Sequence, residues 1–556
     1  MKENRNYSWR LLALVAAVIL SSVFSFQAYS AESMALAGIV SSDKEPQMEG
    51  VLVSAKKVGG TITVTVVSDS HGRYAFPANR LQPGEYRLNA RATGFDLEDP
   101  GVVTLAANKT KEANLKLQPT RDLTSQITNA EWLASAPGSD EDKKGVTCMV
   151  GCHQLAVVAK TKYDADALKV IMARMRNYAA ASINEPGDWV NPVPLPYEEA
   201  ERSEASQKTD ARIAEYLSTI NLSSSPNGKW NYEFKAFPRL KGASTKIIIT
   251  EYDLPRRGFE PHDVVMDPDG MIWTPDFGNG NLGRLNPTTG EFKEWKVPTL
   301  KPDSPAYGLD LAIDKDGNPW FSMMEQGGIS KFDRKTQTFS SWRVPPAYDN
   351  VKAHVGMVAI TRDSKVWFKD SRNNMVHRLD PQTNHYDSYK LPHEFYGMRV
   401  DSIGDLILSS LSLGTIAEID AETGKITDHP TPSPNSGAHR GEMDSKDRYW
   451  FAESNAGKIG MFDTKTKKIE EWPLPFQSYS DPYDAVADKK GDVWAAGMLT
   501  DYVFRLNPQT GQVVTYLLPT HEANIRRLSV DNSTGSVGIW MGENHHARIA
   551  KLEPLE

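Results

Sequence analysis

A repeated unit fills the C-terminal part of the chain, from residue 245 to residue 556. A tryptophan recurs every 40 to 47 residues and is replaced once by isoleucine. Each unit has four short apolar strands separated by turns that contain Asp and Gly. Four strands in about 45 residues are typical of one propeller blade. The seven marker positions, which predict a seven-bladed β-propeller, are Trp273, Trp320, Trp367, Ile407, Trp450, Trp494 and Trp540.

The two ends of the repeat complement each other. The strand at residues 247–252 precedes the first unit and has no blade of its own, and the last unit stops after residues 547–552 without an outer strand. Pairing between these two strands would close the ring. Closure removes the exposed edge that an open sheet presents to other chains. We therefore expect the first strand to complete the last blade.

The repeat resembles the virginiamycin B lyase family, as in residues 269–273 (DGMIW) and 458–463 (KIGMFD). The resemblance covers residues 245–556. It implies a propeller and, in that family, a His base that opens a lactone by elimination beside a magnesium ion held by Glu residues. The matching string here is Glu260-Pro261-His262, with Asp276 in place of the second Glu. The family carries this motif in its last blade, whereas this chain has it in the first.

Further positions follow from the same resemblance. The last blade keeps Glu543 but has Arg526 at the His position, and His439 with Glu453 forms a partial second copy. The resemblance therefore implies His262 and His439 as candidate catalytic residues. The candidate ligands of a divalent cation, Mg²⁺ or Ca²⁺, are Glu260, Asp276, Glu453 and Glu543.

The blade register predicts which side chains face the channel without reference to any family. One set lies where each inner strand begins, and the other lies three residues after the repeat tryptophan. Carboxylates and imidazoles around one axis could bind a cation or a polyhydroxyl substrate, or act as general bases. The same acids could also cap strands at a solvated rim, and we expect His545 and His546 in an exposed loop. The first set is His262, Tyr396, His439, Tyr483 and Arg526, and the second is Asp276, Asp370, Glu453 and Glu543.

The two cysteines of the chain lie in the run Cys148-x-x-x-Cys152-His153. Haem attachment to a c-type cytochrome normally uses Cys-x-x-Cys-His, in which the thiols bond the haem and the His ligates the iron. The run here is one residue longer. The alternative is a local disulfide between cysteines one helical turn apart.

The surrounding segment, residues 119–241, has a helical pattern and resembles a small cytochrome c. The resemblance covers the attachment run, a following helix and a terminal helix. It implies covalent haem c held by Cys148 and Cys152, His153 as the proximal iron ligand and Met175 as the distal ligand. Met172, one turn away on the same face, is the alternative distal ligand. The segment would then exchange electrons with a periplasmic partner.

The N-terminal part contains a predicted export signal followed by predicted strands. Residues 1–31 have basic residues, an apolar stretch and a small-residue end, which is typical of a cleaved signal peptide and predicts a periplasmic or secreted protein. No later segment is apolar enough to span a bilayer. Residues 35–118 alternate apolar and polar residues between turns and resemble the carboxypeptidase regulatory-like family, which implies a β-sandwich used for binding or spacing.

The sequence thus predicts a mainly β protein with an N-terminal β-sandwich, a short all-α cytochrome c-like domain and a C-terminal propeller. A net charge of -8 argues against nucleic acid as a partner. We favour an exported redox protein whose propeller binds a small substrate or partner in its channel. The alternatives are a magnesium-dependent lyase or hydrolase acting on a lactone or glycan-like substrate, and a non-catalytic binding scaffold.

Overall fold

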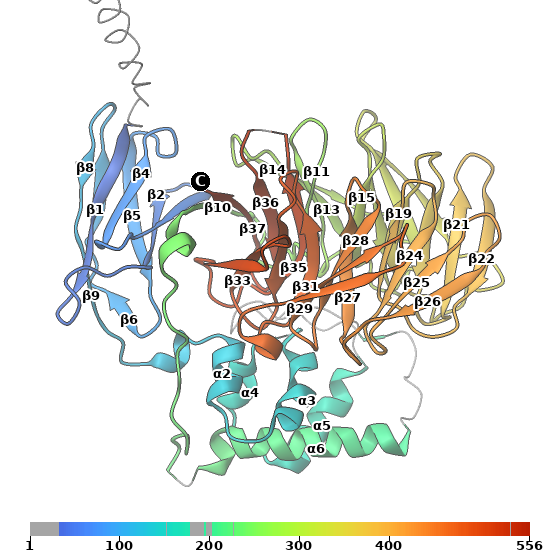
Figure 1. Cartoon of the computed structure of the whole chain (residues 1–556), viewed down its shortest axis with the longest axis horizontal. Coiled ribbons are helices and arrows are strands. Elements are labelled where there is room, and N and C mark those ends of the chain that lie inside the picture. Colours follow the sequence, from blue (N-terminus) through green and yellow to red (C-terminus); the bar gives the residue numbers. More distant parts are fainter. Residues whose placement is uncertain are drawn as a thin grey trace, which may run out of the picture.

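The computed structural model describes residues 33–151, 153–177, 194–195, 203–225, 227–533 and 535–555. The expected signal peptide, at residues 1–31, lies outside this part of the chain. Within it, none of the helices has the length and apolar character needed to cross a membrane. Figure 1 shows a sandwich beside a large β-structure, with the helices gathered against one face of that structure.

The N-terminal sandwich consists of two packed sheets. One has the order β4-β1-β9-β6, with β8 beside β1, and the other contains β3, β2, β5 and β7. Alternate side chains of strands such as β5 and β7 are buried between the sheets, around Tyr74 and Phe76. The strands are β1 (Met34–Ser42), β2 (Leu52–Lys57), β3 (Ile62–Val67), β4 (Arg73–Pro77), β5 (Gly84–Arg91), β6 (Phe95–Leu97), β7 (Val102–Leu105), β8 (Lys111–Glu112) and β9 (Leu115–Pro119).

The middle segment is helical, as its sequence pattern predicts. Thr128 and Glu131 form a capping box at the start of the first helix, and Asp164 caps the helix that ends at Met175. The helices are α2 (Asn129–Ser135), α3 (Asp140–Val150), α4 (Leu155–Ala159), α5 (Ala165–Met175) and α6 (Glu204–Ile220). Short 3-10 turns are η1 (Leu123–Ser125), η2 (Leu222–Ser224), η3 (Gly242–Thr245) and η4 (Gln477–Tyr479).

Seven four-stranded antiparallel units form the C-terminal part. The first three are β11 (Val265–Met266), β12 (Ile272–Pro275), β13 (Asn281–Leu285) and β14 (Phe292–Lys296); β15 (Gly308–Ile313), β16 (Pro319–Met323), β17 (Gly328–Asp333) and β18 (Thr338–Arg343); and β19 (Val355–Ile360), β20 (Val366–Asp370), β21 (Met375–Asp380) and β22 (His385–Lys390). The next two are β23 (Gly397–Val400), β24 (Leu406–Ser410), β25 (Thr415–Ile419) and β26 (Ile426–Pro430); and β27 (Ala438–Met443), β28 (Arg448–Glu453), β29 (Lys458–Asp463) and β30 (Ile469–Pro473). The last two are β31 (Pro482–Ala487), β32 (Val493–Gly497), β33 (Tyr502–Asn507) and β34 (Gln512–Leu517); and β35 (Ile525–Asp531), β36 (Gly538–Glu543), β37 (Arg548–Pro554) and β10 (Ile247–Asp253).

These units are the blades of a closed ring. Each inner strand lies beside the inner strand of the next blade, and β35 of the seventh blade lies beside β11 of the first. Strand β10 pairs antiparallel with β37, with Tyr252 opposite Ile549, which confirms the predicted closure. The repeat tryptophans are buried between blades. Several donate their indole N–H to an Asp six residues earlier, as Trp273 does to Asp267 at 2.8 Å.

Two contacts join the propeller to the rest of the chain. Strand β10 also pairs with β3, so the seventh blade and one sandwich sheet form a continuous eight-stranded sheet. The helices share an apolar cluster with Leu499, which lies in the loop between β32 and β33. The backbone N–H of Ala130 donates to the carbonyl of Leu499 at 2.8 Å. The helical segment is therefore fixed to one face of the ring.

Candidate functional site

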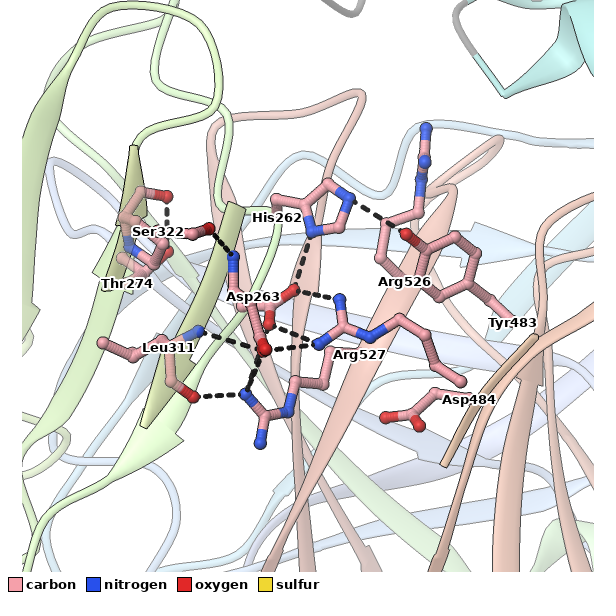
Figure 2. Close-up of polar contacts among 12 residues, drawn as sticks. His262, Asp263, Thr274, Leu311, Ser322, Tyr483, Asp484, Arg526 and Arg527 are labelled. Carbon is pink, nitrogen blue, oxygen red and sulfur yellow. Dashed lines mark hydrogen bonds and ion pairs between the residues drawn. The ribbon is translucent and has the colours of Figure 1, made fainter. Parts of the chain in front are cut away.

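A layer of buried ion pairs closes the propeller axis. The carboxylate of Asp263 accepts hydrogen bonds from both terminal nitrogens of Arg440, at 3.0 and 2.8 Å, and Arg440 also contacts Asp310 at 2.7 Å. Arg527 contacts Asp263, Asp310 and Glu442. Arg399 adds contacts to Asp310 and Glu442. Most of these contacts join blades that are not neighbours, as between Arg440 of the fifth blade and Asp263 of the first, so the network spans the ring. Figure 2 shows part of it around Asp263 and Arg527.

Aromatic and imidazole side chains form a second layer beside these ion pairs. The hydroxyls of Tyr396 and Tyr483 lie 2.6 Å apart, although the two residues come from the fourth and sixth blades. The His439 ring lies 4.6 Å from the Tyr396 ring and 4.2 Å from the Tyr483 ring. The His262 ring packs against Phe277 at 4.9 Å and Tyr483 at 5.8 Å. The predicted first set of channel residues therefore does meet across the axis.

Hydrogen bonding fixes the protonation of His262. Its Nδ1 lies 2.7 Å from Asp263, and its Nε2 lies 3.4 Å from the Tyr483 hydroxyl. Burial would raise the pKa of Asp263, but Arg440, His262 and Arg527 hold it well below its ordinary value. Burial lowers the pKa of His262 to about 4, against the effect of Asp263. His262 is thus a neutral ring that donates from Nδ1 to Asp263 and accepts from Tyr483 at Nε2.

The attachment run lies over this second layer. Arg526 begins the inner strand of the seventh blade and points away from the ion-pair layer, towards the helical segment (Figure 2). Its Nη2 donates to the carbonyl of Gly151, the residue before Cys152. Its guanidinium also lies over the Tyr483 ring, at 5.3 Å. A single side chain therefore contacts both the attachment run and the aromatic layer.

His545 is buried at the same contact and is only 1 % exposed. It interacts with the backbone of Gly151 and lies close enough to Arg526 and His153 for both to influence its charge. The expectation of an exposed loop is therefore wrong for His545. The reason is that the helical segment covers this face of the ring, and a blade repeat does not indicate such coverage.

The haem-related residues are only partly described. Cys152 and the side chain of Cys148 lie outside the described residues, so neither the thioether nor the disulfide alternative is addressed by their geometry. His153 is buried, and its Nδ1 lies 3.1 Å from the carbonyl of Gln154. Met172 packs against the helical core, whereas Met175 is partly exposed at the end of α5.

The predicted carboxylates are buried, and Glu260 and Asp276 are neighbours at the entry of the first blade. Asp276 pairs with Arg256 and accepts from the backbone N–H groups of Glu260 and Gly278. Glu453 lies near Glu471. Burial is the larger cause, and the nearby charge of Glu471 the next, that raises the pKa of Glu453 to about 8.

The other two carboxylates of that set have equally local surroundings. Burial raises the pKa of Glu543 well above its usual value, and the nearby Glu251 adds a smaller effect in the same direction. Asp370 accepts from the amide of Asn373 at 2.6 Å. Among the described residues, the group whose ligand atoms lie within 4.8 Å of one another is Asp401, Asp405 and Glu418, none of which was predicted as a ligand.

Sequence reasoning missed the residues of the ion-pair layer. Half of them directly follow a predicted channel residue: Asp263 follows His262, Arg440 follows His439 and Arg527 follows Arg526. In a regular strand, neighbouring side chains point to opposite faces, so only one of each pair should reach the axis. Several inner strands have a register shift at this point, between Ala438 and Gly441 for example. A β-bulge re-aims the second side chain. The sequence did contain a signal for the ion-pair layer, because charged residues recur directly after members of the first set.

Comparison with known proteins finds one family match and several similar solved structures. Residues 35–118 match the carboxypeptidase regulatory-like domain family. The structure is similar to virginiamycin B lyase from Staphylococcus aureus, with a TM-score of 0.49 and 20 % identity, over 55 % of this chain and 99 % of that one. A streptogramin B lyase structure gives a TM-score of 0.49 and 21 % identity over 56 % of this chain and 99 % of that one. No curated protein matches the chain. At these identities the likeness concerns the fold.

Proposed function

We propose that this chain is an exported c-type haem protein that transfers electrons to or from a periplasmic partner, with the propeller as the platform beneath its haem-attachment run. The observation that carries the proposal is the contact between Gly151 and Arg526. It joins the Cys148–His153 run to the aromatic layer of the propeller. A run that only formed a surface disulfide would have no need of this buried polar contact.

The described residues fit haem c. The placement of His153 Nδ1 beside the Gln154 carbonyl leaves Nε2 as the nitrogen for iron, which is the usual arrangement of a ligating His. Burial lowers the pKa of His153, which keeps the ring neutral as ligation requires. Cys148 and Cys152 would hold the haem covalently. Met175, which does not pack against the helical core as Met172 does, would hold the iron together with His153. Bound haem supplies one-electron redox chemistry.

A divalent cation at Glu260 and Asp276 fits the structure less well than haem c does. Asp276 already accepts hydrogen bonds from Arg256, from Asn281 and from two backbone N–H groups, so about four lone-pair positions of its carboxylate are used. Among the described residues, neither Glu453 nor Glu543 belongs to a group of three ligands whose atoms lie within 4.8 Å of one another. We therefore do not propose the magnesium-dependent lyase reaction as the main activity.

Expression in a periplasm with c-type maturation tests the proposal. The protein should migrate as a haem-staining band after denaturation and show the sharp α-band of a reduced c-type cytochrome. Cys148→Ser and Cys152→Ser together should remove the covalent stain, whereas His153→Ala should keep the stain and change the spectrum. A wild-type protein with neither stain nor α-band, obtained alongside a control cytochrome that matures normally, would refute the haem function.

A further inference from the structure

We propose that Arg526, His545 and His439 form a carboxylate-binding site between the attachment run and the aromatic layer of the propeller. The bound group is either a free small-molecule carboxylate or a propionate of the haem itself, because both present the same chemistry. The inference extends the proposed function by naming what the propeller face binds. Its free-ligand form does not depend on haem.

Arg526 is a buried cation without an anionic partner. It is 8 % exposed, and no carboxylate forms an ion pair with it in the part of the chain that the structure describes. Its fixed contacts are neutral: Nε donates to the Asn524 side chain at 2.6 Å, and Nη2 donates to the Gly151 carbonyl. A buried charge is costly unless it is paired. The guanidinium fork is well suited to a carboxylate.

The carboxyl of Asp481, which acts on Arg526, is only partly ionised at neutral pH. Burial raises the pKa of Asp481 to about 7, and Arg526 opposes that rise. Asp481 is therefore a poor permanent counter-ion at neutral pH. In the ion-pair layer below, by contrast, Arg440 and Arg527 each contact at least two carboxylates. The positive charge available to a ligand is thus concentrated on the helical side of the aromatic layer.

Two buried imidazoles add donors that other described side chains do not use. His545 interacts with the Gly151 backbone, but neither of its ring nitrogens makes a hydrogen bond of normal geometry within the described residues, and the same holds for Nδ1 of His439. His545 is 1 % exposed and His439 is 4 % exposed. Arg526 is close enough to both rings to lower their pKa values, after the larger effect of burial. Buried polar atoms are normally satisfied, so orphaned nitrogens beside an unpaired guanidinium indicate a missing acceptor.

The test uses benzoate as the probe and benzamide as its uncharged analogue, at constant ionic strength. Binding is measured by calorimetry on the holoprotein and on the haem-free Cys148→Ser, Cys152→Ser variant. Arg526→Gln removes the charge, Arg526→Lys keeps it, and Arg448→Gln is the control. Arg448 lies over an aromatic ring as Arg526 does, that of Trp450, but it pairs with Asp444 across the turn between β27 and β28 of the fifth blade.

Two results would support the site, and they distinguish a free carboxylate ligand from a haem propionate. A free carboxylate ligand predicts that the holoprotein binds benzoate in preference to benzamide, and that Arg526→Gln weakens binding about tenfold or more while Arg448→Gln does not. A haem propionate predicts that only the haem-free variant binds benzoate. In that case Arg526→Gln lowers the haem midpoint potential, Arg526→Lys restores most of it, and the propionate band in the resonance Raman spectrum shifts.

The site is refuted if both forms bind benzoate no better than benzamide and Arg526→Gln leaves the midpoint potential where Arg448→Gln leaves it. If the haem-free variant does not fold, the midpoint potential and the resonance Raman spectrum of the holoprotein still test whether Arg526 binds a haem propionate. Failure of the haem function appears separately, as a wild-type protein without the covalent stain. The benzoate titration of that protein would then test the free-ligand form alone.

Discussion

The charged residues at the propeller axis form a network in which every member has at least two partners. Asp263, for instance, contacts Arg440, Arg527 and His262. Charges buried this deeply stabilise a structure only when all are matched, because each has lost its hydration. Removing one member therefore leaves its former partners buried with one fewer opposite charge.

Asp263→Asn should lower the free energy of unfolding by about 3 to 5 kcal/mol, since Arg440 and Arg527 each lose a buried carboxylate. Urea denaturation followed by tryptophan fluorescence measures the change. Asp269→Asn is the matched control: Asp269 pairs with Arg334 but its side chain is 69 % exposed, so the loss should be below about 1 kcal/mol. Equal losses in both variants would contradict this account of the network.

Glu453 should make stability fall as pH rises. Its folded pKa is about 8, above its ordinary value of 4.5, so the folded state holds a proton that the unfolded state has released between these two pH values. Stability decreases with pH wherever the folded state binds more protons. Glu453→Gln should therefore gain up to about 4 kcal/mol over the wild type between pH 5 and pH 8. A gain independent of pH, measured by denaturation across this range, would contradict the raised pKa.

At this scale the sequence predicted one set of axial residues and not the other. His262, Tyr396, His439, Tyr483 and Arg526 follow from strand alternation, which is local. Arg440 and Arg527 reach the axis because the inner strands bulge, and His545 is buried because another part of the chain covers it. Bulges and coverage depend on tertiary contacts that a repeat pattern does not contain.

Strand β10 is the element that joins two domains. It pairs with β37 on one side and with β3 on the other, so neither of its edges is free. The pairing with β37 was predictable from the incomplete last blade. The pairing with β3 was not, because strand alternation says nothing about which sheet of another domain a strand will meet.

Thr65→Pro should disrupt this shared sheet. Thr65 lies within β3, opposite Ile249 of β10 and Ser54 of β2, so proline there removes a ladder hydrogen bond between paired strands. We expect a loss of about 3 kcal/mol or more and easier proteolysis between the sandwich and the propeller. Val102→Pro, on the edge strand β7, is the control and should cost much less. Resistance of both variants to protease would contradict a structural role for the pairing.

In the whole molecule, the helical segment serves as a cover for one face of the ring. Its apolar core includes Leu499 of the propeller, and the N–H of Ala130 bonds to the carbonyl of that residue. The sequence predicted a sandwich, a helical segment and a propeller in this order, and the structure has all three. Their docking depends on a few side chains far apart in the chain, which no local pattern connects.

Leu499→Ala should loosen this cover without opening the ring. Leu499 is 1 % exposed, and truncating a buried leucine costs about 2 to 5 kcal/mol. Hydrogen exchange should rise in α2 and α4 while the inner strands of the propeller stay protected. Leu413→Ala, at a position 48 % exposed, should change neither region. Unchanged exchange in the helices of the Leu499 variant would show that the docking does not rest on this contact.

Strand β37 is the last strand of the ring along the chain, and this sets an order for synthesis. A polypeptide is made from its N-terminus, so β3 and β10 both emerge long before their last partner. The ring cannot close until residues 548–554 are finished, and for most of that time β3 is the one neighbour available to β10. The sandwich thus holds the seam strand in place, and a chain that stops a few residues early retains its first blades but lacks the strand that completes the ring.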